Sequence, residues 1–218
     1  MRAGKFFSPE ALLEIERAVE AAEQHTSGEI VPYVVGRSDD YPQAAWKAAC
    51  VGALIAGLAA AAIRAWGGFW GPASAWWLAL PPLAGAAFGL IAVALLPPLR
   101  RALITGADLE EAVERRAALA FLEQEVFDTA ERTGILLFLS LFERRVVVLG
   151  DSGINRAVVK EDWEGIVAEV VAGIRAGRPG AALASAIARC GELLERHRVV
   201  RRADDRDELP DYLRIKPE

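Results

Sequence analysis

The sequence contains few of the side chains on which most metal and nucleophile chemistry depends. Its 218 residues include two cysteines and two histidines. Neither Cys50 nor Cys190 has a second cysteine at metal-ligand spacing, so CxxC redox motifs and zinc fingers are excluded and two buried, reduced thiols are expected. His25 and His197 each stand at the expected end of a helix, where an imidazole interacts with the helix dipole. The sequence also has no phosphate-binding loop, no HExxH motif and no GxSxG motif.

Basic charge is too scarce and too scattered for nucleic-acid binding. The chain has 25 Lys and Arg against 30 Asp and Glu, a net charge of −5, and no basic stripe interleaved with aromatic residues. The basic start Met1–Phe7 is not followed by an apolar stretch, so no secretory signal peptide is expected. Instead Ser8-Pro9-Glu10 has the order of a helix cap, a first-turn proline and a first-turn acid.

The longest segment without charge runs from Ala65 to Leu99, which contains no Asp, Glu, Lys or Arg. Ala48–Ile63 is a further uncharged segment, and Trp76–Leu96 is the second apolar one, interrupted by Pro81-Pro82. A bilayer core needs about 20 apolar residues per helix. We therefore predict a two-helix transmembrane hairpin over roughly Trp46–Leu96, with either a kink at the prolines or a first turn in the interface. The alternative is a pair of buried core helices, which the rest of the chain is too small to cover.

Aromatic and basic residues mark the ends of the predicted spans. Five of the six tryptophans lie there, as in an aromatic belt: Trp46, Trp66, Trp70, Trp76 and Trp77. Basic residues precede and follow the hairpin, whereas its turn has one at its border: Arg37, Lys47, Arg100 and Arg101 against Arg64. By the positive-inside rule, we predict a multi-pass protein of the cell (inner) membrane with both termini in the cytoplasm. Gly85-x-x-x-Gly89 permits close helix contact, or is incidental in an Ala/Gly-rich segment.

The remaining sequence alternates helical and strand patterns. The strands are predicted at Ile30–Val35, Ile135–Leu141 and Val146–Leu149, the last two as an antiparallel hairpin. Pro32 favours an edge or irregular strand, because proline cannot donate to the ladder. A long helix is predicted over Leu109–Arg132. The predicted fold class is α/β, a small mixed sheet covered by helices and interrupted by the transmembrane hairpin.

The predicted domains follow from this order. Residues 1–43 form the first part of the α/β domain, 44–99 the transmembrane hairpin and 100–200 the second part of the domain. Residues 201–218 form a charged, loosely ordered tail. The interruption is compatible with one fold, because a hairpin returns the chain to the side it left.

Three aspartates are the candidate metal ligands. Asp39 and Asp40 follow the first predicted strand, and Asp151 follows the third. If those strands share a sheet, the two loops can converge, and carboxylate oxygens suit Ca²⁺ or Mg²⁺. Such an ion can polarise a phosphate. The alternative is that all three are ordinary turn residues, which aspartate also favours.

The run Thr133–Ile154, with its strand, Glu-Arg-Arg turn, strand and Gly-Asp-x-Gly, resembles the TPM domain family, also called the TPM phosphatase family. Further similarity lies at Thr26–Val31, around Trp163, at Gly177–Ala188 and at Asp207–Asp211, the last resembling the bacterial membrane-bound branch. The resemblance implies an α/β/α sandwich. Some family members are described as acid phosphatases or calcium binders, and others serve the assembly or maintenance of membrane complexes. This sequence departs from the better-known branch, having an internal anchor and Gly150-Asp151-Ser152-Gly153 in place of a Gly-Tyr-Gly-like segment.

Two functions are therefore predicted side by side. The first is a membrane-anchored TPM-like module that binds, assembles or maintains membrane protein partners, or self-associates through its hairpin. The alternative is a divalent-metal-dependent acid-phosphatase-like hydrolase using Asp39, Asp40 and Asp151. Whether the chain is an enzyme at all stays open between the two.

Overall fold

The computed structural model describes residues 6–24, 26–67, 76–197, 199 and 209–216. The chain divides into two compact units. The α/β unit comprises Met1–Asp39 and Glu110–Glu218, and the hairpin unit comprises Asp40–Leu109. Each unit is described by itself below.

The α/β unit contains a four-stranded mixed sheet. Its strands are β1 (Glu29–Val35), β2 (Gly134–Ser140), β3 (Arg145–Gly150) and β4 (Arg214–Ile215), in the order β3-β2-β1-β4. β1 is parallel to β2 and β4, and β2 is antiparallel to β3. The small mixed sheet and the antiparallel β2–β3 hairpin confirm the prediction from the sequence.

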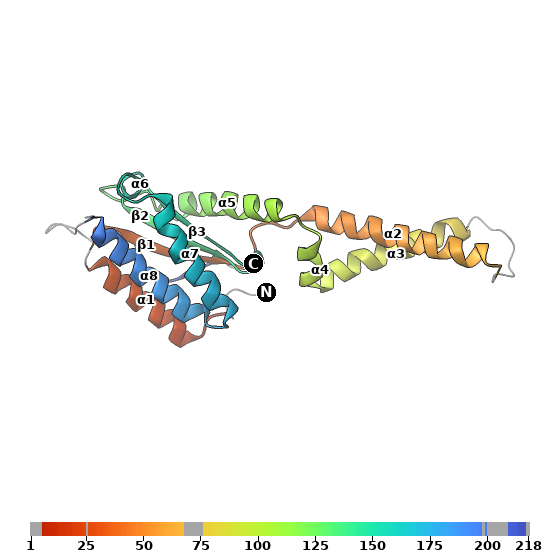
Figure 1. Cartoon of the computed structure of the whole chain (residues 1–218), viewed down its shortest axis with the longest axis horizontal. Coiled ribbons are helices and arrows are strands. Elements are labelled where there is room, and N and C mark those ends of the chain that lie inside the picture. Colours follow the sequence, from red (N-terminus) through yellow and green to blue (C-terminus); the bar gives the residue numbers. More distant parts are fainter. Residues whose placement is uncertain (1–5, 25, 68–75, 198, 200–208, 217–218) are drawn as a thin grey trace. The chain divides into compact units, whose positions relative to one another are not determined.

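Helices cover both faces of this sheet (Figure 1). One face packs against α1 (Pro9–Glu23), α7 (Lys160–Arg175) and α8 (Pro179–Arg196), and the other packs against α5 (Gly106–Glu123). A short α6 (Ile154–Ala157) follows β3. The larger core lies on the α1/α7/α8 side, where alternate strand residues such as Ile30, Val34 and Leu137 are buried. The residues between them in β1 and β2, including Val31 and Phe138, form the second core under α5.

The sequence predicted the start of α1 correctly but not the bounds of α5. α1 starts as predicted, since the Ala11 amide donates to the Ser8 hydroxyl at 3.2 Å. The long helix expected over Leu109–Arg132 is wrong at both ends, because α5 runs from Gly106 to Glu123. Its first turn is capped by the Thr105 hydroxyl, which accepts from the Asp108 amide at 3.2 Å.

Pro32 lies in β1, which is an interior strand rather than the expected edge strand. The backbone N–H and C=O groups of the odd-numbered residues of β1 form hydrogen bonds on the β2 side. For example, the Glu29 amide donates to the Thr133 carbonyl. The backbone groups of the even-numbered residues point to the opposite side, where the Val34 carbonyl accepts from the Lys216 amide. β4 reaches only Tyr33 and Val34 on that side. The missing N–H of Pro32 therefore removes nothing from the β1–β2 ladder.

The end of the chain is more ordered than the predicted loose tail. Residues 201–208 lie outside the described part, but β4 pairs in parallel with β1. Leu213 is buried against the α1/α7/α8 core. The charges that suggested a solvated tail therefore flank a short segment that completes the sheet.

The hairpin unit consists of α2 (Pro42–Ala65), α3 (Trp76–Leu95) and the short α4 (Pro97–Ala102). At 1.5 Å per residue, α2 is about 36 Å long and α3 about 30 Å, each long enough for a bilayer core. Only 11% of the most apolar 18 residues of either helix is buried within the protein. Helices in the core of a soluble domain are mostly covered, so this exposure favours the transmembrane hairpin over the alternative of two buried core helices. α3 continues through Pro81 and Pro82 as one helix.

Small residues hold α2 and α3 together. A Cβ atom placed on Gly85 would lie 2.2 Å from the Gly52 carbonyl oxygen, and one on Gly89 would lie 2.2 Å from the Ala48 carbonyl oxygen. The two backbones therefore touch, which only glycine permits at these positions. The predicted close contact through Gly85 and Gly89 is confirmed, and its partner is α2 of the same chain.

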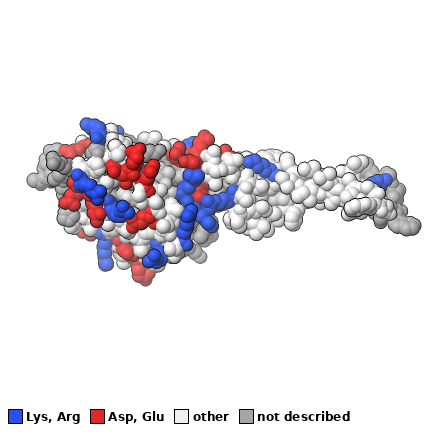
Figure 2. Space-filling view, in the orientation of Figure 1, with Lys and Arg blue, Asp and Glu red and all other residues white. Residues whose placement is uncertain are grey.

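The outward faces of the hairpin helices are apolar. Figure 2 shows Lys, Arg, Asp and Glu gathered over the α/β unit, with few on α2 and α3. Large apolar side chains with at least 45% of their surface exposed follow both helices: Trp46, Val51, Leu54, Ile55, Leu58 and Ile63 on α2, and Trp76, Leu78, Leu80, Leu83, Phe88, Leu90, Ile91 and Leu95 on α3.

Candidate functional site

A buried polar cluster lies where β1 and β2 end. Glu143, in the turn between β2 and β3, is completely buried. One carboxyl oxygen accepts from the Ser38 amide at 2.9 Å, and the other accepts from the Ser140 hydroxyl. The Ser38 hydroxyl donates in turn to the Ser140 hydroxyl at 3.0 Å. The cluster therefore ties the segment after β1 to the β2–β3 turn, and its carboxyl group is not accessible to a substrate.

Asp39 lies next to this cluster at the protein surface. Its carboxylate is 2.7 Å from the Arg115 guanidinium of α5, and about a third of its side chain is exposed. Glu111 lies 3.6 Å from the same guanidinium. An ion pair of this exposure contributes about 0–1 kcal/mol. Asp40 is exposed, and its backbone carbonyl accepts from the Arg100 guanidinium within the hairpin unit.

Asp151 occupies a different environment. Its buried carboxylate is 2.6 Å from the Arg132 Nε and caps the Ser152 amide at 2.6 Å. Its own amide donates to the Gly134 carbonyl at the start of β2. These contacts hold the loop after β3 against the segment that enters β2.

The structure does not bring the three candidate aspartates together. β3 runs antiparallel to β2, so Gly150 pairs with Ile135, near the start of β2. β1 runs parallel to β2, so Val35 pairs with Ser140 at the other end. The two loops are therefore separated by a strand of seven residues, about 20 Å. The convergence predicted for Asp39, Asp40 and Asp151 is wrong, because it depended on β1 and β3 running in the same direction.

Among the described residues, no group of three or more His, Cys, Asp or Glu side chains is arranged to hold a metal ion. Binding of Ca²⁺ or Mg²⁺ by any single aspartate stays a prediction, and so does the hydrolase activity. His25 lies outside the described residues. His197 caps the end of α8 as predicted, with Nε2 3.3 Å from the Asp162 carboxylate of α7.

Cysteine chemistry is restricted by burial in the α/β unit. Cys190 is completely buried in α8, and burial raises the pKa of its thiol to about 12. A thiol with that pKa has almost no thiolate at neutral pH and is therefore a poor nucleophile. The expected buried thiol is confirmed for Cys190, whereas Cys50 is exposed on α2.

A second polar network was not indicated by the sequence. The buried Arg116 of α5 donates to the Tyr33 hydroxyl at 3.0 Å and contacts the Glu123 carboxylate at 2.9 Å. Burial raises the pKa of Tyr33, although Arg116 acts in the opposite direction. Arg214 of β4, whose pKa burial lowers, donates to the Gln124 carbonyl at 3.2 Å. No local signal in the sequence distinguishes Arg116 from the exposed charges of α5.

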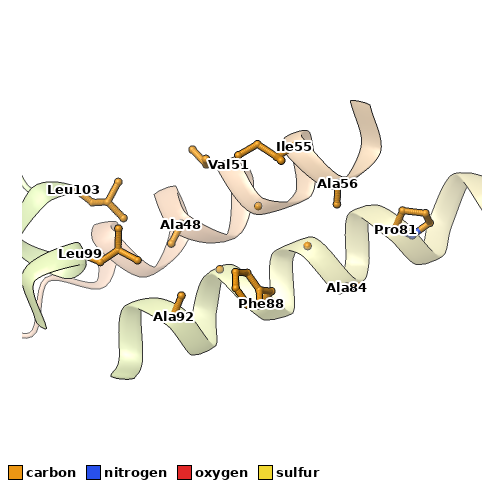
Figure 3. Close-up of a pocket in the computed structure, with 13 residues that line it drawn as sticks. Ala48, Val51, Ile55, Ala56, Pro81, Ala84, Phe88, Ala92, Leu99 and Leu103 are labelled. Atoms are coloured by element: carbon orange, nitrogen blue, oxygen red, sulfur yellow. The ribbon is translucent and has the colours of Figure 1, made fainter. Parts of the chain in front are cut away.

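An apolar groove follows the hairpin helices (Figure 3). Its volume is about 590 Å³, within the usual range of about 300–1,000 Å³ for small-molecule sites. The side chains of Phe88 and Ile55 project beside its middle, and Leu99 and Leu103 lie at one end (Figure 3). The other lining residues are also apolar: Ala48, Val51, Gly52, Ala56, Pro81, Ala84, Gly85, Gly89 and Ala92.

No protein-family model matches the chain, and no curated protein matches it. Among solved structures, the NMR structure of the BA42 protein from the psychrophilic bacterium Bizionia argentinensis is similar. The TM-score is 0.59 and the identity 18%, over 97% of this chain and 96% of that one. A likeness at this identity concerns the fold alone, so membership of the TPM family stays a prediction. The comparison therefore places the chain beside a solved fold without assigning it an activity.

Proposed function

We propose that the chain is a multi-pass protein of the cell membrane whose hairpin unit spans the bilayer. The observation that carries this proposal is the exposure of large apolar side chains along both helices of the hairpin. Burying these side chains in lipid removes their apolar surface from water, which stabilises the inserted state by roughly 25 cal/mol per Å² of buried surface. The tight glycine contact between α2 and α3 supports it further, since membrane helices associate through small residues.

The charges support an orientation with both termini in the cytoplasm. Lys47, Arg100 and Arg101 lie at the open end of the hairpin, and Arg64 lies at the end of α2 near the turn. Cytoplasmic flanks of membrane helices carry the excess of Lys and Arg. The α/β unit, which contains both termini, is then on the cytoplasmic side.

Labelling of single cysteines tests the anchoring and the orientation. In a Cys50→Ala, Cys190→Ala background, Trp66→Cys marks the hairpin turn and Glu16→Cys marks the exposed side of α1. We expect the chain to stay in the membrane pellet at alkaline carbonate pH. A membrane-impermeant maleimide is expected to label the Trp66→Cys variant in intact cells, and the Glu16→Cys variant only after permeabilisation. Release by carbonate, or labelling of both variants from the same side, would contradict the proposal.

We further propose that the α/β unit is a non-enzymatic module of the TPM type that binds or stabilises membrane protein partners. Its completely buried Glu143 and ion-paired aspartates support a structural role for these acids. The tether confines the unit to the membrane surface, where other membrane proteins are its neighbours.

Chemical crosslinking in native membranes checks the partner proposal. We expect purification of the full chain after crosslinking to recover a membrane protein in near-stoichiometric amount. The matched control is an unrelated two-helix hairpin protein expressed at the same level. Equal recovery with both baits would remove the support for a specific partner.

A further inference from the structure

Basic side chains gather at one end of the apolar groove. Lys47 directly precedes the lining residue Ala48, and Arg100 directly follows the lining residue Leu99. The Lys47 ammonium donates to the carbonyl of Leu103, another lining residue, at 3.0 Å. This hydrogen bond places a cation at the mouth of the groove. An ammonium group has two further N–H donors for a ligand.

The charge of the hairpin unit has the opposite sign to that of the whole chain. The chain has a net charge of −5, but Asp40–Leu109 contains four basic and two acidic residues. Three of the four basic residues, Lys47, Arg100 and Arg101, lie within two positions of the lining residues Ala48, Leu99 or Leu103 in the sequence. The Arg100 guanidinium donates to the Asp40 carbonyl. The mouth therefore offers N–H donors and positive charge together.

We propose that the hairpin unit binds one anionic phospholipid, with an acyl chain along the groove and the phosphate at Lys47, Arg100 and Arg101. The groove walls are apolar over the span from Ala48 to Ala56, about 12 Å of helix at 1.5 Å per residue. Lysine and arginine bind phosphate through charge-assisted hydrogen bonds. Basic pockets on the cytoplasmic side of membrane helices bind anionic headgroups. This inference rests on the proposed anchoring and orientation, which place the mouth at the anionic leaflet.

A second copy of the hairpin fits the groove less well than a lipid does. Two copies in one membrane have the same orientation, so a helix of one copy lying along the groove of the other brings two clusters of three cations to the same depth. Like charges placed together in this way are unfavourable. An anionic headgroup neutralises the cluster instead.

Lipid titration in an uncharged detergent, followed by native mass spectrometry, tests the proposal. The probes are phosphatidylglycerol and phosphatidylcholine with the same acyl chains. We expect at least tenfold tighter binding of phosphatidylglycerol. The triple variant Lys47→Gln, Arg100→Gln, Arg101→Gln is expected to weaken that binding about a hundredfold, at about fivefold per cation. Arg64→Gln is the matched control, since it removes a cation from the other end of α2, and Arg100→Lys is expected to retain the preference.

A second pair of variants tests the groove itself. Ala84→Leu fills the groove, and Ala87→Leu adds the same side chain on α3 at a position that does not line it. We expect the first to weaken phosphatidylglycerol binding at least tenfold and the second to leave it unchanged. Equal binding of both lipids by a chain that resists carbonate extraction would overturn the lipid site alone. A lipid-free dimer would also overturn it, and a chain soluble without detergent would overturn both the site and the anchoring.

Discussion

Replacing Glu143 by alanine is expected to lower the free energy of unfolding of the α/β unit by about 2–4 kcal/mol. The carboxyl group accepts from the completely buried Ser140 hydroxyl and from the partly buried Ser38 amide. A buried donor without a partner costs about 1–3 kcal/mol, and alanine leaves one such donor at Ser140 and a second, partly buried one at Ser38. Hydrogen exchange of the β1 and β2 amides, read by mass spectrometry on the full chain, measures the change within this unit.

Two control variants separate this effect from the loss of charge. Glu143→Gln keeps one carbonyl oxygen as an acceptor, so we expect about half the loss. Glu111→Ala removes an exposed carboxylate 3.6 Å from Arg115, and a change within about 0.5 kcal/mol is expected. If Glu143→Ala were as stable as Glu111→Ala, the buried cluster would not hold the loop after β1.

Gly85→Ala is expected to destabilise the hairpin by about 1–3 kcal/mol. The new Cβ would lie 2.2 Å from the Gly52 carbonyl oxygen and 2.6 Å from the Ala56 Cβ, so the two helices must separate. The obstacle is backbone, which cannot rotate away as a side chain can. Titration of detergent-solubilised chain with sodium dodecyl sulfate, followed by helical ellipticity, measures the loss.

Gly57→Ala is the matched control on the partner helix. A Cβ there would lie 3.4 Å from the Pro82 Cγ, close to ordinary contact. Because alanine favours a helix over glycine by up to about 1 kcal/mol, this variant is expected to be as stable as the parent or more stable. Equal stability losses in both variants would show that the α2–α3 contact does not depend on the glycines.

The fold was largely predictable where local signals are strong. The β-branched and leucine-rich runs predicted β1, β2 and β3, and the uncharged segment predicted α2 and α3 within a few residues at most ends. The missed elements lack such signals. β4 has only two residues in a charged segment, and the polar sequence after Glu123 continues the charge pattern of α5 without continuing its helix.

The candidate site was less predictable, because it depends on strand direction. Spacing shows that an aspartate follows a strand, but the end of the sheet at which it lies depends on whether the strands are parallel. Asp151 follows the antiparallel β3 and therefore lies away from Asp39. Glu143 was predicted as a turn residue, and its buried carboxylate accepts from the amide of Ser38, which is 105 positions earlier in the chain. Contacts over such a separation leave no pattern within a sequence window.

The parallel pairing of β1 with β2 also affects the order of events during synthesis. The paired residues Glu29 and Gly134 differ by 105 positions, and the whole hairpin lies between them. At about 5–20 residues per second, a ribosome needs about 5–20 s to make that stretch. For the proposed membrane protein, both apolar helices therefore leave the ribosome before the sheet can close. In that proposal, entry into the bilayer comes first, and the α/β unit is assembled on a chain that is already tethered.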